Sequence, residues 1–217
     1  MKLFVDTGSI KEIETIAQLG ILDGVTTNPS LLAKEPGDYR DNLRKICGIV
    51  KGPVSGEVTA TDFAGMLREG HDIASIDPYM VVKVPLTRDG IRACKALSGE
   101  GIKVNVTLCF TAAQALLAAK AGAMFVSPFV GRLDDVATNG MELIREIVDI
   151  FDNYEFPTEV LVASCRHPIH VVEAARLGAD IATCPPKVID QLFNHPLTNI
   201  GLENFLKDWE KAHAVKA

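Results

Sequence analysis

Short apolar runs rich in β-branched residues alternate along the chain with longer segments whose apolar positions recur at the spacing of a helix. We expect strands at residues 3–7, 24–28, 54–59, 80–85, 103–109, 124–130, 159–164 and 181–184. We expect helices at residues 9–20, 38–50, 62–75, 88–99, 111–121, 139–153, 168–177 and 186–193. Strict alternation of strand and helix is typical of parallel strands joined by helical crossovers.

Residues that begin and end helices support several of these boundaries. Ser9 with Glu12, and Thr111 with Gln114, have the spacing of a capping box. Four glycines stand where a helix should end in a left-handed residue, namely Gly20, Gly70, Gly122 and Gly178. We therefore expect helices to start and stop at these positions.

Eight strand–helix units are the number that closes a (β/α)₈ TIM barrel, and 217 residues suffice for one with short loops. An open doubly wound sheet is the alternative, but it normally carries a glycine-rich phosphate loop after its first strand. The first expected strand runs into DTGS at 6–9, which lacks the GxGxxG pattern. No linker interrupts the repeat, so we expect one α/β barrel domain over residues 1–217.

The segment after the eighth unit predicts one more helix, at about residues 199–215. Its apolar residues recur at i, i+3, i+4 and i+7 and are Leu202, Phe205, Leu206 and Trp209. Such a stripe could pack on the chain's own barrel. It could also cross onto a neighbouring subunit and help to build a homo-oligomer.

Composition and charge narrow the classes of function. The chain has 22 Lys and Arg against 28 Asp and Glu, a net charge of −6, which excludes the broadly basic surface of a non-specific nucleic-acid binder. The N-terminus has an acid at its sixth position and no apolar core of signal-peptide length. The longest uncharged stretch, 104–119, is too short to span a bilayer. We expect neither a nucleic-acid partner nor a membrane segment.

The cysteines and histidines give no pattern of metal ligands. Five cysteines form an odd set with no CxxC pair, so neither a disulfide framework nor a zinc cluster is expected. A reduced, cytoplasmic protein is the simplest interpretation. His167 and His170 flank Pro168, but no third ligand accompanies them, so we expect no metal site.

Polar residues stand late in several strands that are otherwise apolar. In a barrel alternate side chains point inward, and the active site lies at the C-terminal ends of the strands. An unpaired buried polar group costs about 1–3 kcal/mol, so a purely structural strand would carry Val or Leu there. The polar positions are Asp6, Asn28, Glu57, Lys83, Asn105, Thr107, Ser127, Ser164 and Arg166. Together they predict an active site, although Asp6 alone could cap a helix and Asn28 could belong to a turn.

Lys83 is the most informative of these residues because it lies within the run MVVKVP at 80–85. The middle of a strand gives its side chain little chance to reach water, and desolvation disfavours the ammonium form. A neutral amine attacks carbonyl carbons, which is the requirement for Schiff-base catalysis. The alternative is a buried ion pair of Lys83 with Asp6 or Glu57, although such pairs seldom add stability.

The two acids are suited to the proton transfers of such a reaction. A carboxylate near an iminium, here Glu57, can relay protons through a hydroxyl such as that of Thr107 or through a water. Asp6, on a different strand, is suited to deprotonating a substrate hydroxyl as a carbon–carbon bond breaks. Two acids in different settings can thus divide two proton transfers.

Arg132 and Arg166 follow the sixth and seventh expected strands. Guanidinium groups match phosphate oxygens bidentately, and Ser164 could add a further donor. A single surface arginine is usually just solvated. Two at adjacent strand ends, beside a candidate imine, favour a phosphate-sugar site.

In these motifs the chain resembles the transaldolase family, in particular the short branch that includes fructose-6-phosphate aldolase. The motifs in order are FVDT at 4–7, GVTTNPS at 24–30, VKVP at 82–85, NVTL at 105–108, SPFVGR at 127–132 and ASCR at 163–166. The resemblance covers essentially the whole chain and includes the C-terminal helix. It implies assemblies based on pentamers, often decamers, which fits a helix that crosses to a neighbouring subunit.

The resemblance also implies roles for the catalytic residues. Lys83 would form the Schiff base, Glu57 and Thr107 would hold a water that moves protons, and Asp6 would act on the hydroxyl of the bond being broken. The reaction would transfer a dihydroxyacetone unit from sedoheptulose 7-phosphate or fructose 6-phosphate to glyceraldehyde 3-phosphate or erythrose 4-phosphate. No metal or organic cofactor is implied, since the protonated imine is itself the electron sink.

For the substrate, the resemblance implies two sets of contacts. The dihydroxyacetone hydroxyls would be held by Asn28, Asn105 and Ser127. The phosphates of donor and acceptor would be bound by Arg132, Ser164 and Arg166.

Two positions separate transferases from aldolases in the branch that the chain resembles. Members that release free dihydroxyacetone look like they carry Gln at the position of Glu57 and Tyr at that of Phe129, whereas this chain has the transferase pattern. A tyrosine hydroxyl would be an extra proton donor for hydrolytic release, while a phenyl ring keeps the intermediate dry until an acceptor arrives. We expect a transaldolase, with an aldolase or a non-catalytic sugar-phosphate-binding barrel as alternatives.

Overall fold

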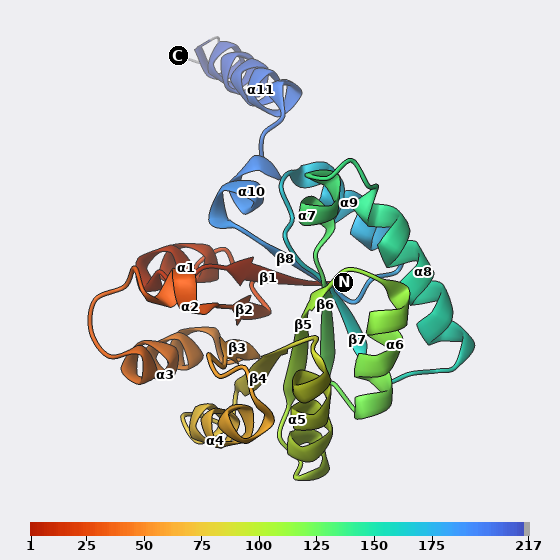
Figure 1. The fold of residues 1–217 in the computed structure, drawn as a ribbon. Helices are drawn as coiled ribbons and strands as arrows, with labels where there is room; N and C mark the ends of the chain where they lie inside the picture. Colours follow the sequence, from red (N-terminus) through yellow and green to blue (C-terminus); the bar gives the residue numbers. More distant parts are fainter. Residues whose placement is uncertain (215–217) are drawn as a thin grey trace.

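Eight parallel strands close into a barrel in the computed structural model, which describes residues 1–214 (Figure 1). Each strand pairs with its neighbours in sequence order, and the last pairs with the first. The strands are β1 Lys2–Asp6, β2 Gly24–Thr26, β3 Val54–Glu57, β4 Met80–Pro85, β5 Val104–Cys109, β6 Phe125–Pro128, β7 Glu159–Val162 and β8 Ile181–Cys184. The expected (β/α)₈ TIM barrel is confirmed, and the alternative of an open doubly wound sheet is wrong.

Helices follow the strands and surround the barrel (Figure 1). Those predicted from the helical spacing are α1 Ile10–Ala17, α3 Tyr39–Val50, α4 Phe63–Ala74, α5 Arg88–Gly99, α6 Ala112–Ala121, α8 Gly140–Asn153, α9 Pro168–Arg176 and α10 Pro186–Gln191. Two short helices that the pattern does not predict, α2 Pro29–Leu32 and α7 Val130–Asp134, follow β2 and β6. Within residues 1–214, every helix is too short or too polar to cross a membrane.

The two-residue period of the strands separates two environments. Outward-pointing residues are mostly valines, such as Val5, Val25 and Val82, and they pack with the inner faces of the helices in one apolar core. Inside the barrel, a smaller apolar cluster fills the end where the strands begin and includes Phe4, Val81, Phe125, Leu161 and Ile181. The remainder of the interior, toward the strand ends, is polar, and this division places the site.

Some expected boundaries are wrong by a few residues. β2, β3, β6 and β7 each end two residues before their expected ends, because the chain turns there into the loops that carry the site. Gly70 does not end a helix. It lies inside α4, where an added Cβ would be 2.8 Å from Leu97 Cδ1, so close packing against α5 explains this glycine.

The two expected capping boxes behave differently. Thr111 caps α6, with the Gln114 N–H donating to Thr111 Oγ1 at 3.1 Å. Ser9 makes no side-chain cap bond at the start of α1. The Glu12 carboxylate there accepts the Thr7 hydroxyl at 2.6 Å, so this spacing did not form a capping box.

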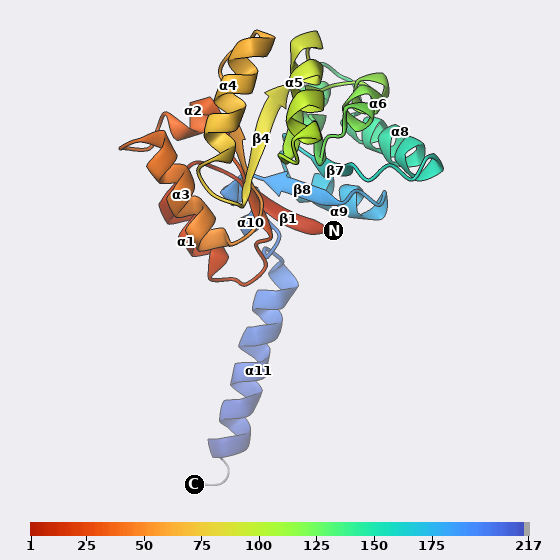
Figure 2. The same ribbon diagram turned by 90° about the horizontal axis from the view of Figure 1, so that it is seen from below.

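The ninth expected helix is α11 Pro196–Ala214, and it extends away from the barrel (Figure 2). No residue of α11 is buried, and Phe205 and Trp209 are 75% and 66% exposed. Of the two alternatives considered from the sequence, packing of this apolar stripe on its own barrel is therefore wrong for the single chain. Position 215, the expected end of the helix, lies outside the described residues.

Replacing Gly90 with Ala should destabilise the protein, because the first turn of α5 touches the end of β4 at this glycine. An added Cβ would lie 1.8 Å from the Pro85 carbonyl oxygen. We expect a loss of roughly 1–3 kcal/mol in the free energy of unfolding, measured by urea or thermal unfolding.

Gly48→Ala is the matched control, because Gly48 lies on the exposed side of α3 with no atom within 4 Å of the added carbon. It should gain about 0.5–1 kcal/mol from the better helix propensity of alanine. Equal stability of the two variants would contradict the close contact between α5 and β4.

Candidate functional site

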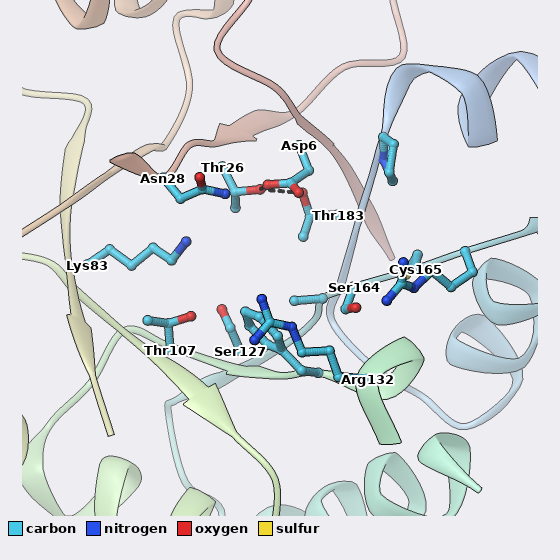
Figure 3. A pocket seen from close by; sticks show the side chains of 14 residues that line it. Asp6, Thr26, Asn28, Lys83, Thr107, Ser127, Arg132, Ser164, Cys165 and Thr183 are labelled. Atoms are coloured by element: carbon cyan, nitrogen blue, oxygen red, sulfur yellow. Dashed lines mark hydrogen bonds between the residues drawn. The ribbon is translucent and has the colours of Figure 1, made fainter. Parts of the chain in front are cut away.

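A cavity of about 240 Å³ opens at the C-terminal ends of the barrel strands. Figure 3 shows side chains from β1, β2, β4, β5, β6 and β8 facing one another across it. Nine predicted site residues line it: Asp6, Asn28, Lys83, Thr107, Ser127, Phe129, Arg132, Ser164 and Arg166. Glu57 and Asn105 lie outside this lining and contact residues within it. The structure thus brings together residues from seven separate strand ends.

Lys83 lies on β4 with only 5% of its surface exposed. Pairing of β3 with β4 places Glu57 beside it, and Lys83 Nζ lies 3.0 Å from Glu57 Oε2. The amine also donates to the Thr27 carbonyl oxygen at 2.9 Å. The ion pair considered from the sequence therefore exists, with Glu57 as the partner. An amine beside a carboxylate can give up a proton to it and then attack an electrophile in the cavity.

A second cavity of about 300 Å³ lies next to the first, and the two share part of their lining. The shared residues are Asn28, Lys83, Thr107, Phe129 and Arg132. Glu57 lines the second cavity and not the first, whereas Lys83 lines both. The pair formed by Lys83 and Glu57 lies at their boundary.

Thr107 lines both cavities, and its hydroxyl is buried without a hydrogen-bond partner among the described residues. A buried hydroxyl without a partner costs about 1–3 kcal/mol. The next residue, Leu108, has φ +60°, and the pairing of β5 with β6 shifts register here. Strain next to an unsatisfied hydroxyl indicates that Thr107 is placed to bind a water or a substrate hydroxyl.

Asp6 belongs to a hydrogen-bonded row of three strand ends, visible in Figure 3. The Thr26 hydroxyl donates to Asp6 Oδ1 at 2.7 Å, and the hydroxyls of Thr26 and Thr183 are 2.6 Å apart. Asp6 therefore does not cap a helix. Thr26 and Thr183 are not among the predicted site residues. The two-residue period of a strand could have identified them, because Thr26 shares a face with Asn28, and Thr183 with the inward-pointing Ile181.

The two asparagines use their side chains within the protein. Asn28 Oδ1 accepts the Leu31 N–H at 3.0 Å and so caps α2, which leaves its amide nitrogen for a ligand. Asn105 is fully buried, donates to Ser55 Oγ at 3.2 Å and accepts the Ser127 hydroxyl at 2.7 Å. Asn105 thus lies behind the cavity wall and orients Ser127.

Arg132 lies on α7, which follows β6, and Arg166 lies in the loop between β7 and α9. The Arg132 guanidinium lies 5.3 Å from the centre of the Phe129 ring, and Phe129 meets Phe110 edge-on with centroids 5.8 Å apart. Arg166 Nη2 lies 2.7 Å from Asp135 Oδ2, with both side chains about half exposed. Exposed pairs of this kind contribute about 0–1 kcal/mol, so an anion can replace Asp135 at little cost.

The thiols are unsuited to act as nucleophiles. Burial raises the pKa of Cys47, Cys94 and Cys109 to about 12. Cys165 lies in the cavity wall, and a hydrogen bond with Cys184, followed by burial, raises its pKa well above the usual range. These thiols stay protonated at neutral pH, which leaves the Lys83 amine as the candidate nucleophile.

The arrangement combines an amine, two carboxylates in different surroundings and two guanidinium groups around two adjoining cavities. Such a set can attack a carbonyl, move protons on either side of it and hold an anionic group. Within residues 1–214, no cluster of three or more His, Cys, Asp and Glu side chains is placed to hold a metal ion.

The chain is similar in sequence to a known family of enzymes and to individual relatives in that family. The family described as Transaldolase/Fructose-6-phosphate aldolase matches residues 3–216. The chain is 58% identical over 215 residues to a "Probable transaldolase" of Nitrosopumilus maritimus (strain SCM1), covering 99% of this chain and 97% of that protein. It is 60% identical over 211 residues to a "Probable transaldolase" of Anaeromyxobacter sp. (strain K), covering 97% of each.

Among solved structures, the thiamine phosphate pyrophosphorylase from Pyrococcus furiosus is similar with a TM-score of 0.62 at 15% identity, covering 88% of this chain and 93% of that one. Identity this low shows a shared barrel fold and nothing about the reaction. The family match, by contrast, is a match of sequence over nearly the whole chain, and the two relatives near 60% identity agree with it. The chain belongs to the transaldolase/fructose-6-phosphate aldolase family.

Proposed function

We propose that the protein is a transaldolase that moves a dihydroxyacetone unit between sugar phosphates through a Schiff base on Lys83. The observation that carries this proposal is the Lys83 amine itself, which is buried in the barrel, lies 3.0 Å from a carboxylate and faces a cavity that also contains two arginines. Membership of the family supports an enzyme of the aldolase or transaldolase kind.

The reaction begins when Lys83 passes a proton to Glu57 and its amine adds to C2 of the ketose, and loss of water then gives a protonated imine. Asp6 takes the proton of the C4 hydroxyl, the C3–C4 bond breaks and an aldose phosphate leaves. The electron pair of that bond moves into the imine, which becomes an enamine. The enamine attacks the aldehyde of an acceptor aldose phosphate, Asp6 returns the proton, and water hydrolyses the new imine to release the product.

Glu57 and Thr107 serve the proton transfers at the imine. Glu57 Oε2 is close enough to Lys83 Nζ to accept its proton. The unpartnered Thr107 hydroxyl is suited to hold a water between the two cavities. Through this water Glu57 would give and take the protons of the carbinolamine hydroxyl.

The remaining residues bind the substrate in this proposal. Asn28 and Ser127 hold the dihydroxyacetone hydroxyls, with Asn105 acting through its hydrogen bond to Ser127. Arg132, Ser164 and Arg166 bind the phosphate. For Arg166, the phosphate would replace Asp135.

The alternative of an aldolase that releases free dihydroxyacetone differs in what happens to the enamine. Phe129 lines both cavities with a ring that carries no proton donor. Its neighbour Phe110 packs against it edge-on, which adds a second apolar ring at this place. An apolar wall slows protonation of the enamine and favours transfer to an acceptor.

We further propose that the protein is a homo-oligomer, a pentamer or decamer, in which α11 packs on a neighbouring subunit. The support is a helix of 19 residues with no buried side chain and an exposed apolar stripe. Burying a large apolar side chain contributes about 1.5–3 kcal/mol, and a helix that buries none gains no such stabilisation in the single chain. A second copy of the chain would cover the stripe.

Reduction with sodium borohydride in the presence of fructose 6-phosphate should leave one covalent adduct, on the peptide that contains Lys83. Peptide mass spectrometry checks the site. Lys83→Ala should have neither adduct nor activity, whereas Lys103→Ala, which removes an exposed lysine beside β5, should keep both. An adduct on another lysine, or no adduct, would contradict the Schiff base.

Consumption of fructose 6-phosphate should depend on an acceptor. Adding erythrose 4-phosphate should raise the rate by about tenfold or more, which corresponds to about 1.4 kcal/mol between transfer and release. Phe129→Tyr should reduce this ratio, because its hydroxyl can protonate the enamine. Phe110→Tyr is the control, because Phe110 contacts Phe129 without lining either cavity. Sustained turnover of the unaltered protein without acceptor would instead support the aldolase.

Changing the apolar stripe of α11 should change the size of the assembly. Light scattering at micromolar concentration should give a pentamer or decamer for the unaltered chain. The double variant Phe205→Glu and Trp209→Glu should dissociate it, whereas Lys207→Glu, on the same exposed helix, should not. A monomer in all three samples would refute the oligomer.

A further inference from the structure

The loop that carries Arg166 is tied closely to α7. The Ser164 carbonyl oxygen accepts the Gly131 N–H at 3.2 Å. An added Cβ at Gly131 would lie 2.2 Å from that oxygen and 2.6 Å from Arg166 Nε, so no larger residue fits there. Ser164 itself has φ +61°, a strained conformation for a residue with a side chain. A loop of this kind keeps one conformation only if other groups support it.

His170, the third residue of α9, supplies such a support. The Arg166 main-chain N–H donates to His170 Nδ1 at 3.2 Å, and His170 Nε2 lies 2.9 Å from Asp134 Oδ2. Because Nδ1 accepts a hydrogen bond, the ring proton belongs on Nε2, where it donates to Asp134. The other oxygen of Asp134 accepts the Gly140 N–H at 2.9 Å, which anchors this row of contacts to α8.

The main chain of Arg166 is therefore held more firmly than its side chain. The guanidinium pairs with Asp135 in a position that is about half exposed. His170, by contrast, is 4% exposed, and both of its ring nitrogens are bonded. A buried imidazole with two satisfied nitrogens fixes the distance between its partners, which an apolar side chain could not do.

We propose that His170 is a positioning residue, which fixes the Arg166 main chain by accepting its N–H while Asp134 holds the ring. Because the Arg166 main chain is fixed, its guanidinium group lies within reach of the substrate phosphate. This proposal rests on the proposed function, in which Arg166 binds that phosphate. His170 does not line the cavity and acts through Arg166.

The support requires a neutral imidazole, and the surroundings of His170 favour that form. Burial is the largest cause that lowers the pKa of His170, and His167, with its ring centroid 3.9 Å away, lowers it further. Asp134 from α7 and Glu173 from α9 act in the opposite direction without reversing the shift. When the pH falls through this lowered pKa, Nδ1 gains a proton and faces the Arg166 N–H as a second donor. The contact is then lost.

Two substitutions of His170 separate its two hydrogen bonds. His170→Gln can keep an amide nitrogen near Nε2 for Asp134 but offers no acceptor to Arg166, whereas His170→Asn can place an oxygen near Nδ1. At pH 8 we expect His170→Gln to raise KM for glyceraldehyde 3-phosphate about 3- to 10-fold with little change in kcat, the effect of one lost hydrogen bond. His170→Asn should restore KM, and His167→Ala should leave it unchanged. KM for unphosphorylated glyceraldehyde should be the same in all variants.

Several results would overturn the proposal. Equal KM values for His170→Gln and the unaltered enzyme would do so. A fall in kcat of the same size for glyceraldehyde and its phosphate would indicate a purely structural role. Arg166→Ala tests the proposed function separately. An unchanged KM in that variant refutes phosphate binding by Arg166, whereas a rise there without one in His170→Gln refutes only the positioning role.

The pH dependence of KM provides a second test if His170→Gln fails to fold. As the pH falls below the ordinary histidine pKa of about 6.5, KM of the unaltered enzyme for glyceraldehyde 3-phosphate should rise more steeply than that of His170→Asn, whose side chain does not titrate. Ionisation of the substrate phosphate near about pH 6 affects both enzymes equally. Profiles that coincide would overturn the proposal.

Discussion

The contact on which the site depends is the one between Lys83 Nζ and Glu57 Oε2, 3.0 Å apart inside the barrel. Moving each charge out of water costs several kcal/mol, and the mutual attraction of a buried pair often fails to recover that cost. A valine and a leucine in this place would have stabilised the fold at least as well. The pair is therefore best explained by chemistry, since a carboxylate within reach of the amine is what allows a lysine to lose and regain its proton.

The barrel makes this contact possible because alternate residues of each strand point in opposite directions. One set packs against the helices, and the other points into the barrel interior. On β4 the outward valines pack with helices, while Val81 and Lys83 point inward at successive levels. The level of Val81 fills the barrel with apolar side chains, so the polar level of Lys83 rests on an apolar layer. Stability and chemistry thus occupy alternate residues of the same strands, and a change in one need not disturb the other.

The sequence was sufficient to predict the barrel and most of the cavity for the same reason. Alternation of apolar and polar residues is a local property, and once eight strands are parallel, polar residues late in the strands must converge. Residues that act from helices and loops could not be found in this way. Asp135 and His170 come into contact with the Arg166 segment only because α7 and α9 pack beside it.

The positions of backbone strain could not be predicted from the sequence either. Leu108 and Ser164 have positive φ, a conformation imposed by the register shift of β5 and by the loop after β7 rather than by residue type. The apolar pattern places both positions in ordinary strands, at residues 103–109 and 159–164. The position of α11 also depends on tertiary context, because an apolar stripe specifies that it will be covered but not by which surface.

The division of charge within the cavity places one more constraint on the substrate. Asp6, Glu57 and Lys83 come from β1, β3 and β4, whereas Arg132 and Arg166 follow β6 and β7. Charges in solution are screened over about 8 Å at physiological ionic strength, so the net charge of −6 hardly opposes an anion that has already entered. What the anion meets are the nearby charges, and the two guanidinium groups of the cavity lining both lie on the β6–β7 side. In the proposed reaction a sugar phosphate would be oriented by its charged end, and its ketone carbon would face Lys83 only if the Arg166 guanidinium is correctly placed. On this proposal, the chemistry at Lys83 on one side of the cavity depends on how firmly the Arg166 main chain is fixed on the other side.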